Sequence, residues 1–476
     1  MTTTTVTDLA SFTVATNFEQ LPPEVVHESK RTLLDSIGCA LAGVGFPKAN
    51  AAVKFARSMS GPDDTATILG TTQRGSAVAA AFANAELINT LDMDCVLPPG
   101  HVAPAVLASI LAVAEEKHCD GKAVLEAIAV SHEMSNRFGK AMDNLRDTKE
   151  GESRPPRVFG YTSPVFGAAA AIGKLKGHDA EVIAHALGIA ACISPVNSMM
   201  TWIHHAPATT IKYTMMGALS QAAFTAAAMA EYGHRGDVQV LDDREYGYPR
   251  FIGTDKWEPQ RITEGLGTQW RFPAETSYKP YPHCRVFNAL QDCVIGLVTD
   301  HAIAPDEIDA IRIYVEAFAE KPVWVTRSIE DVHDAQFSMY HGIAVAAHRV
   351  PPGRDWLDPA FIRSASVLAL MHKVSSAPHP DYVKLLTGNA ASRPARVEID
   401  ARGQTFTAEK RYPKGSRSPE PDTWMTDQEL VAKFLHNAKS VVPDDRARRI
   451  ADTVMGLEQV TDMAAIVRLA AGAQTN

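Results

Sequence analysis

The sequence predicts a mainly α-helical protein in which a smaller α+β domain is inserted into a large all-helical domain. Most of residues 1–265 repeat their apolar positions every three or four residues, as amphipathic helices do. After about Trp270 several segments alternate with period two, and the tail returns to the helical pattern. The predicted parts are a helical domain over 1–268, an α+β lid domain over 269–412, and a C-terminal segment over 413–476 that rejoins the helical domain.

The first predicted helix covers 25–43. Its apolar residues recur at intervals of three and four, Pro22-Pro23 precedes it, and Gly43 marks its end. Several segments with the same spacing are dense in Ala and Gly, and such small residues let helices approach closely in a bundle. These further helices are predicted over 101–117, 122–142, 164–175, 180–193 and 209–232.

The strands of the smaller domain are predicted from alternating residues. Ile308–Ala317 alternates and is rich in Ile and Val, and Ala395–Ala401 and Thr405–Tyr412 alternate likewise, with Arg402-Gly403-Gln404 as a hairpin turn. Helices are predicted over 284–298, 337–350 and 359–372, and again in the tail from 426 to 471.

The composition limits the possible functions. The 476 residues are 46% hydrophobic and carry a formal net charge of −9 without a run of like charges, so nucleic acid is not an expected partner. The six cysteines lie far apart and no CxxC or HExxH motif occurs, which argues against a disulfide scaffold, a structural zinc and an iron–sulfur cluster. The N-terminus lacks a signal-peptide pattern, and the longest apolar run, 105–114, is too short to span a membrane. We expect a soluble, cytoplasmic protein with no membrane partner.

The first candidate for chemistry is the segment Asp92-Met93-Asp94-Cys95-Val96-Leu97-Pro98-Pro99-Gly100-His101. Two acids and a histidine flank a Pro-Pro-Gly break between two predicted helices. His101 falls at a helix start, where the positive end of the helix dipole favours a neutral imidazole and suits a proton acceptor. The alternative is that Asp92 and Asp94 cap helix ends and His101 merely opens a helix.

Four further segments place polar side chains at predicted helix starts or at the domain boundary. A lysine in the first turn of an apolar helix opposes the helix dipole, and two cations near a domain boundary could hold carboxylates. The alternatives are solvent-exposed charges, helix caps and residues at the edge of the core. The residues in question are Lys212, Lys279, Arg285, Tyr161, Tyr340 and His341.

In order and spacing, these segments resemble the 2-methylcitrate dehydratase family, also called MmgE/PrpD. The resemblance extends over nearly the whole chain. It implies a helical domain with an inserted lid, homodimers with the site between the domains, and catalysis without a metal or an organic cofactor. Matching pieces include LLDSIGCALAG (33–43), NAELINTLDMD (84–94), KYTMMGALSQAAFTAAAMAEYGHRG (212–236), KPYPHCR (279–285) and AQFSMYH (335–341).

The resemblance also implies roles for residues. Members of the family act on small di- or tricarboxylates and must manage negative charge and protons at a carbon next to a carboxylate. By resemblance, His101 is the general acid/base, Asp92 orients it or binds a substrate hydroxyl, and Lys212 and Lys279 clamp carboxylates and stabilise the developing anion. The remaining substrate-binding residues expected are Asp94, Tyr340 and Arg285.

Departures from the family pattern bear on the substrate. The family usually has Asp-x-Asp-Asp-Thr where this chain has Asp92-Met93-Asp94-Cys95-Val96, so an acid and a hydroxyl are lost. Ungapped alignment puts Tyr161 at a family histidine and His341 at a family tyrosine. We hypothesise that acid/base roles are redistributed between Tyr161 and His341, which would suit a non-standard substrate.

The resemblance leaves the reaction open. We expect a lyase, foremost a hydro-lyase of the 2-methylcitrate dehydratase type, because His101, Lys212 and Lys279 are retained. An epimerase or isomerase, or a decarboxylase of the cis-aconitate type, would need the same anion-stabilising pocket. The third alternative is a non-catalytic carboxylate-binding relative, since the Asp-rich segment is altered.

Overall fold

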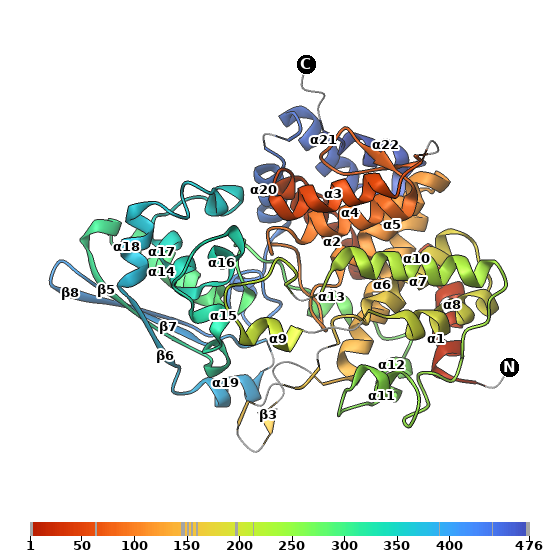
Figure 1. Ribbon diagram of the computed structural model, residues 1–476, viewed down its shortest axis with the longest axis horizontal. Coiled ribbons are helices and arrows are strands. Elements are labelled where there is room, and N and C mark those ends of the chain that lie inside the picture. The colour runs from red at the N-terminus through yellow and green to blue at the C-terminus, as the bar shows by residue number, and fades with distance from the viewer. Residues whose placement is uncertain are drawn as a thin grey trace.

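The computed structural model describes residues 3–61, 64–143, 148–149, 152–153, 156–158, 160–195, 199–212, 214–389, 391–439 and 441–472. This part of the chain is mostly helical with small sheets, as predicted (Figure 1). The helices up to residue 275 are α1 (Thr5–Ala15), α2 (Pro23–Gly43), α3 (Pro47–Ser58), α4 (Ala77–Asn89), α5 (Ala103–Lys117), α6 (Gly121–Ala141), α7 (Pro164–Leu175), α8 (Ala180–Ile193), α9 (Met199–His204), α10 (Met216–Glu231), α11 (Tyr248–Ile252), α12 (Gln260–Thr263) and α13 (Phe272–Glu275).

The second part of the chain mixes helices with a sheet. Its helices are α14 (Asn288–Asp300), α15 (Pro322–Val325), α16 (Val332–Phe337), α17 (Met339–Ala347), α18 (Ala365–His372), α19 (Tyr382–Gly388), α20 (Asp427–Ala438), α21 (Asp444–Met455) and α22 (Met463–Leu469). The strands of the whole described chain are β1 (Ala66–Thr67), β2 (Arg74–Gly75), β3 (Thr148–Lys149), β4 (Glu152–Ser153), β5 (Ile308–Val315), β6 (Val374–Pro378), β7 (Ala395–Ala401) and β8 (Gln404–Lys410).

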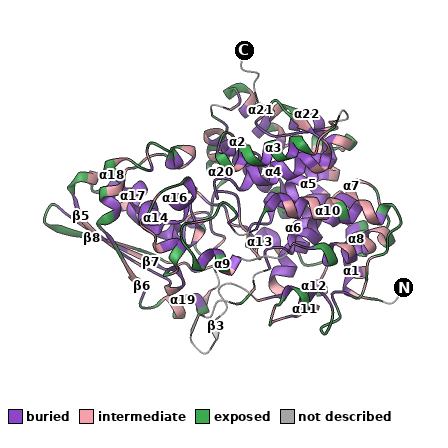
Figure 2. Ribbon diagram, in the orientation of Figure 1, coloured by how far each residue is buried: buried purple, intermediate pink, exposed green. Residues whose placement is uncertain are grey.

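The helical core is built by α4 to α8 together with α10. These helices pack on one another, and their contact faces are almost wholly buried (Figure 2). The predicted close approach is seen at Gly167 in α7, where an added Cβ would lie 2.5 Å from the carbonyl oxygen of Ser131 in α6. Glycine is therefore required there by the distance between the two helices.

Five of the six helices predicted in the first part of the chain are found within two residues of their expected ends. In the second part, the helices predicted over 284–298 and 359–372 begin only at Asn288 and Ala365, and the one predicted over 337–350 ends at Ala347. Helices α7 and α8 have the predicted bounds, and α2, α5 and α6 differ from them only slightly. The helix predicted over 209–232 begins only at Met216. Tertiary contacts hold the preceding segment in another conformation, since the N–H of Ala208 donates to Asp334 and the Lys212 ammonium donates to the carbonyl oxygen of Asn89. Tyr213 lies outside the described residues.

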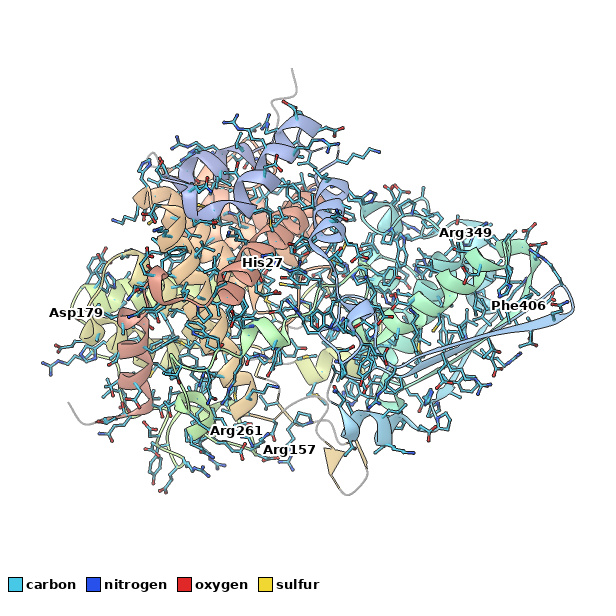
Figure 3. All side chains as sticks on the ribbon, turned by 180° about the vertical axis from the view of Figure 1, so that it is seen from behind. His27, Arg157, Asp179, Arg261, Arg349 and Phe406 are labelled. Atoms are coloured by element: carbon cyan, nitrogen blue, oxygen red, sulfur yellow. The ribbon has the colours of Figure 1, made fainter. Side chains whose placement is uncertain are left out.

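The larger sheet has the strand order β6-β5-β7-β8. Strand β5 is parallel to β6 and antiparallel to β7, and β7 and β8 form the predicted hairpin, with Arg402 and Gly403 in the left-handed region at φ 55° and 70°. Helix α14 packs on β7 and β8, and α17 packs on β6. Figure 3 shows Arg349 and Phe406 toward the far end of this sheet, remote from Asp179 in the helical part.

The C-terminal helices pack on helices from the start of the chain. Helices α20 and α21 contact α2, and α22 contacts α5, so the blue helices of Figure 1 lie beside the red and orange ones. This packing accords with the predicted return of the tail, while the domain boundaries themselves stay a prediction. Among the described residues, no helix is long and apolar enough to cross a membrane.

Three buried histidines make the stability of the fold depend on pH. Burial lowers the pKa of His132 and His341 to about 4 and that of His283 to about 3. A histidine in the unfolded chain titrates near 6.5. Between that pH and about 4 the unfolded chain therefore binds more protons than the folded chain, and the free energy of unfolding falls as the pH is lowered. We expect a fall on the order of 1 kcal/mol per pH unit for each histidine.

Urea unfolding at a series of pH values checks this prediction. The midpoint should fall steadily below pH 6.5, and the variant His132→Leu should show a shallower fall than the unmodified protein. His132 suits this comparison because, among the described residues, the hydrogen-bond contacts of its Nδ1 lie within its own helix, to the carbonyl oxygen of Ile128 at 2.9 Å and to the Ser131 hydroxyl at 3.4 Å. A midpoint that is flat down to pH 4.5 would contradict the prediction.

Candidate active site

A cavity of about 360 Å³ opens between the loop that precedes α5 and residues from the second part of the chain. Its lining residues include Met199 of α9 and Ala274 and Glu275 of α13, two helices that Figure 1 labels near the middle of the molecule. Lysine and arginine supply four cations to its wall, whereas Glu275 supplies the single carboxylate among the lining residues, so the wall favours an anionic ligand. The polar lining residues are His101, Lys140, Tyr161, Glu275, Ser277, Cys284, Arg285, Trp324, Arg393 and Arg417.

The loop between α4 and α5 carries both acids and the histidine of the first candidate segment. Helix α4 ends at Asn89, and α5 begins at Ala103, directly after His101 and Val102. Asp92 has a left-handed backbone with φ 54°, a conformation that aspartate and asparagine adopt more readily than most residues. A strained residue at this place is consistent with a functional requirement for the direction of its carboxylate.

A tight turn within this loop sets His101 beside Tyr161. Leu97 and Gly100 exchange backbone hydrogen bonds of 2.9 and 2.6 Å around Pro98-Pro99. A Cβ at Gly100 would lie only 1.9 Å from a ring carbon of Tyr161. Because this position has no side chain, the Tyr161 ring can approach the turn that holds His101.

The same loop is anchored from behind by an ion pair between α2 and α20. Asp35 in α2 accepts a hydrogen bond from the backbone N–H of Cys95 at 2.9 Å and pairs with Lys433 of α20 at 2.6 Å. The Lys433 ammonium also donates to the carbonyl oxygen of Met93 at 2.7 Å. Two helices far apart in sequence therefore fix the backbone that carries Asp92 and Asp94.

Asp92 is the centre of a buried cluster of cations. One carboxylate oxygen accepts a hydrogen bond from Lys279, and the other lies 3.5 Å from the Lys212 ammonium and 3.7 Å from His101 Nε2. The side chains of Asp92, Lys212 and Lys279 are fully buried. Lys212 is held further by Gln336 at 3.4 Å and by the carbonyl oxygens of the α4 end.

The charges in this cluster shift the pKa values of its members. Burial raises the pKa of the Asp92 carboxyl, but the cations Lys279, Lys212 and His101 outweigh burial and hold it well below its ordinary value. Burial lowers the pKa of Lys212 to about 7, against the attraction of Asp92. For Asp94, His101 likewise outweighs burial and lowers the pKa. Both carboxylates are therefore ionised at neutral pH.

His101 is oriented by Asp94. Its Nδ1 lies 2.7 Å from one Asp94 oxygen, and the other Asp94 oxygen accepts a hydrogen bond of 3.2 Å from the Asn89 side-chain amide. A carboxylate on Nδ1 keeps the proton on that nitrogen and leaves proton exchange to Nε2. The ring is 4% exposed and lines the cavity. A histidine held in this way can serve as a general acid or base.

Tyr161 forms the adjacent part of the cavity wall. Its ring centroid lies 6.4 Å from that of His101, with the two planes inclined by 26°. Burial raises the pKa of the phenol, so the hydroxyl stays protonated at neutral pH. A protonated hydroxyl in this position can donate a hydrogen bond to an anion in the cavity.

The two predicted lysine clamps lie together on a protein carboxylate. Lys212 and Lys279 both pair with Asp92, and neither is among the residues that line the cavity. Their role as clamps for a carboxylate of a bound acid stays a prediction. Arg285, the other predicted cation, does line the cavity and donates a hydrogen bond of 2.7 Å to Ser416.

Tyr340 and His341 are not brought to the cavity either. The His341 Nε2 lies 3.0 Å from the carbonyl oxygen of Ile362, and the Tyr340 hydroxyl lies 2.9 Å from Ser376 on β6. Neither residue is among those that line the cavity. The hypothesised exchange of roles between Tyr161 and His341 is therefore not supported, because only Tyr161 faces the site, and the expected contact of Tyr340 with substrate has no support either.

The placement of His341 predicts that it can be replaced without loss of turnover. In His341→Gln the side-chain amide can still donate to the Ile362 carbonyl, so we expect turnover to change by less than about threefold. The comparison is Tyr161→Phe, which removes a hydroxyl from the wall and should lower turnover by at least about tenfold. Steady-state rates on the substrate identified for the wild type check both, and a larger loss in His341→Gln would contradict the placement.

Sequence reasoning missed several residues of the site. Lys433 lies on an amphipathic helix and resembles an ordinary surface lysine. The pairing of Asp35 could have been predicted from the sequence, because an ionisable residue inside the apolar stretch LLDSIGCALAG needs a buried partner. No motif marks the lining residues Trp324 and Arg393.

No metal site is evident in the described ranges. Among these residues, no three His, Cys, Asp or Glu side chains are grouped as metal ligands.

Comparisons with known proteins find matching family models and related proteins over nearly the whole chain. The family model of the MmgE/PrpD N-terminal domain matches residues 7–260, and that of the MmgE/PrpD C-terminal domain matches residues 281–459. The cis-aconitate decarboxylase-like protein oryM of Aspergillus oryzae is 26% identical, over 95% of this chain and 94% of its own. The cis-aconitate decarboxylases of Aspergillus terreus and Homo sapiens are each 25% identical, over 95% of this chain and 92% and 91% of theirs.

Proposed function

The chain belongs to the MmgE/PrpD family, and from this premise we propose that it is a lyase that acts on a small di- or tricarboxylate by proton transfer next to a carboxylate. Of the reactions considered, we favour decarboxylation of an acid of the cis-aconitate type. The observation that carries the proposal is a histidine oriented by a carboxylate in the wall of a cationic cavity, namely His101 on Asp94. The similarity to cis-aconitate decarboxylases over nearly the full chain supports the choice of reaction.

The residues of the cavity account for the steps of such a reaction. Loss of a carboxylate as carbon dioxide breaks a carbon–carbon bond and leaves the electron pair conjugated with a neighbouring carboxylate, as in an enediolate. The guanidinium of Arg285 and the protonated hydroxyl of Tyr161 line the place where that charge develops, and fixed donors of this kind stabilise it. His101 then gives the proton on Nε2 to the carbon and recovers a proton from solvent.

The buried lysines act on this step through Asp92. Lys212 and Lys279 keep that carboxylate ionised, and Asp92 and Asp94 together flank the imidazole of His101 at 3.7 and 2.7 Å. The two carboxylates thereby fix the position of the ring in the cavity wall. In this proposal Asp92, Lys212 and Lys279 are positioning residues.

A hydro-lyase reaction of the 2-methylcitrate type is the second candidate. It needs an acid for the departing hydroxide as well as a base for the proton, and Tyr161 beside His101 supplies a second proton donor in the same wall.

Incubation of the purified protein with cis-aconitate tests the proposal. We expect release of carbon dioxide together with a five-carbon unsaturated diacid, followed by NMR. New alkene absorbance from 2-methylcitrate or citrate would indicate a hydro-lyase, and deuterium uptake from solvent without net conversion would indicate an epimerase. Thermal stabilisation by all these acids without any conversion would favour a non-catalytic relative and overturn the proposed lyase activity.

We also propose the domain boundaries, the oligomeric state and the cellular compartment, each from a different observation. The helical domain would comprise 1–268 and 413–476, with a lid over 269–412, and the support is the packing of α20 to α22 on α2 and α5. A homodimer is proposed from the family resemblance, and light scattering in solution tests it. The six cysteines are free thiols, which supports a reducing compartment such as the cytoplasm.

A further inference from the structure

Arg393 enters the cavity wall from a firmly held piece of backbone. It lies two residues before β7, and its N–H donates to the carbonyl oxygen of Arg411 at 2.8 Å. The preceding Ser392 is fully buried and accepts a hydrogen bond of 3.0 Å from the Arg411 guanidinium. The two main-chain segments that flank the β7–β8 hairpin therefore hold each other, and the base of the Arg393 side chain has a fixed position.

The guanidinium of Arg393 is mostly buried but has few hydrogen-bond or ion-pair partners. Its side chain is 17% exposed, and its ion pair with Glu316 is long, at 3.9 Å. Within the described residues, its Nε and Nη1 are buried without a hydrogen-bond acceptor. A guanidinium has five N–H donors, and burying them unpaired is unfavourable, so the geometry favours an acceptor that comes from outside the chain.

Trp324 adds a second donor of the same kind. It is 1% exposed, lines the same cavity, and its indole N–H has no hydrogen-bond acceptor among the described residues. Its ring packs on Phe318, with ring centroids 5.0 Å apart, two residues after the Glu316 that pairs with Arg393. Both donors therefore line the same cavity and lie next to the segment from Glu316 to Phe318.

Two of the other three cations in the wall form shorter ion pairs. Lys140 pairs with Glu275 at 2.7 Å, and Arg417 pairs with Glu28 at 2.8 Å. Compared with these pairs, the long contact of Arg393 leaves most of its charge available to the cavity. A carboxylate is the natural complement, because it offers only acceptors and can receive two parallel N–H bonds from a guanidinium.

We propose that Arg393 and Trp324 form a carboxylate-binding subsite that determines substrate specificity. The subsite takes a carboxylate other than the one at the reacting carbon, and so selects acids with two or three carboxylates over monocarboxylates. This inference rests on the proposed function for the identity of the ligand as a polycarboxylate. It goes beyond that function by assigning one carboxylate of the substrate to two residues that lie outside the motifs of the first candidate segments.

Direct binding of a non-reactive acid tests the subsite. Propane-1,2,3-tricarboxylate is titrated calorimetrically at physiological salt into the wild type, Arg393→Met, Arg393→Lys and Trp324→Phe. We expect Arg393→Met to weaken binding by about tenfold to a hundredfold, Arg393→Lys to weaken it less, and Trp324→Phe to weaken it by a few-fold. In turnover, the same variants should raise KM with a smaller effect on kcat.

The matched control is Arg396→Met, three residues further along the chain. Arg396 is 42% exposed, pairs with Glu398 and is not among the lining residues, so binding should stay within twofold of the wild type. Thermal unfolding without ligand establishes that each variant is folded. The subsite is refuted if Arg393→Met binds the tricarboxylate as well as the wild type, if Arg396→Met weakens binding equally, or if the wild type does not bind it.

These outcomes separate the subsite from the proposed function. A protein that binds propane-1,2,3-tricarboxylate through Arg393 but converts no acid would refute the lyase reaction and support the subsite. A protein that releases carbon dioxide from cis-aconitate with an unchanged KM in Arg393→Met would support the lyase reaction and refute the subsite.

Discussion

Replacement of His101 by alanine is expected to lower kcat by about 10²- to 10⁴-fold, the range that the loss of a general acid or base usually produces. The reason is geometric, since His101 is the residue of the cavity wall whose ring is oriented by a carboxylate, at 2.7 Å from Asp94. The measurement is the rate of carbon dioxide release from cis-aconitate, or of the reaction that the substrate panel identifies. Binding of propane-1,2,3-tricarboxylate should be much less affected than kcat.

A control variant and a rescue experiment test whether the loss of turnover is due to the missing imidazole of His101. His132→Leu removes a buried histidine of α6 that is not among the lining residues, and its turnover should stay near that of the wild type. Free imidazole added to His101→Ala should restore part of the activity, because the truncated side chain leaves room next to the cavity. A His101→Ala variant that turns over within tenfold of the wild type would remove His101 from the mechanism.

Replacement of Asp92 by asparagine is expected to destabilise the fold by about 3–5 kcal/mol, because it leaves the buried amino groups of Lys279 and Lys212 without their carboxylate. Asparagine tolerates the left-handed backbone at this position almost as well as aspartate, so the substitution isolates the charge from the conformation. The prediction is checked by the midpoint of urea unfolding at pH 7, together with the loss of turnover that follows from a displaced His101.

The matched control is Asp94→Asn in the same loop. The principal cationic partner of Asp94 is the single imidazole of His101, whereas Asp92 is paired with two fully buried lysines, Lys279 and Lys212. The stability lost in Asp94→Asn should therefore be smaller. Removing a lysine as well, in Asp92→Asn with Lys279→Met, should recover part of the loss. Equal losses in the two single variants would show that the buried charges are not the cause.

Local sequence signals were sufficient for most of the helices and for one hairpin. Helix α7 was predictable because Pro164 marks its start and a run of Ala and Gly follows, and the β7–β8 hairpin because alternating residues flank Arg402-Gly403. Strand β6 was missed. Its five residues, VSSAP, do not alternate, and only the parallel pairing with β5 makes them a strand. The late start of α10 was missed for a similar reason, since long-range contacts hold the preceding residues.

The sequence predicts which residues belong to the site better than it predicts where their side chains point. The sequence placed Asp92, Asp94 and His101 together because one short loop carries them. The direction of a side chain is set by the packing of distant segments, and no local pattern reveals it. Lys212 and Lys279 therefore meet as expected but on Asp92 rather than in the cavity, and His341 turns to the Ile362 carbonyl. Arg393 becomes part of the wall only through the fold of the strands around it.

The anchoring of the 92–95 loop by Lys433 determines when this loop can become fixed during synthesis of the chain on the ribosome. Translation makes the loop early, whereas the lysine that fixes its backbone is added when nine-tenths of the chain already exists. Until α20 is synthesised and docks on α2, the Asp35 carboxylate lacks this partner and the loop lacks its rear support. We therefore expect a prematurely terminated chain that lacks α20 to lose the fixed position of Asp92 and Asp94, and with it the proposed activity.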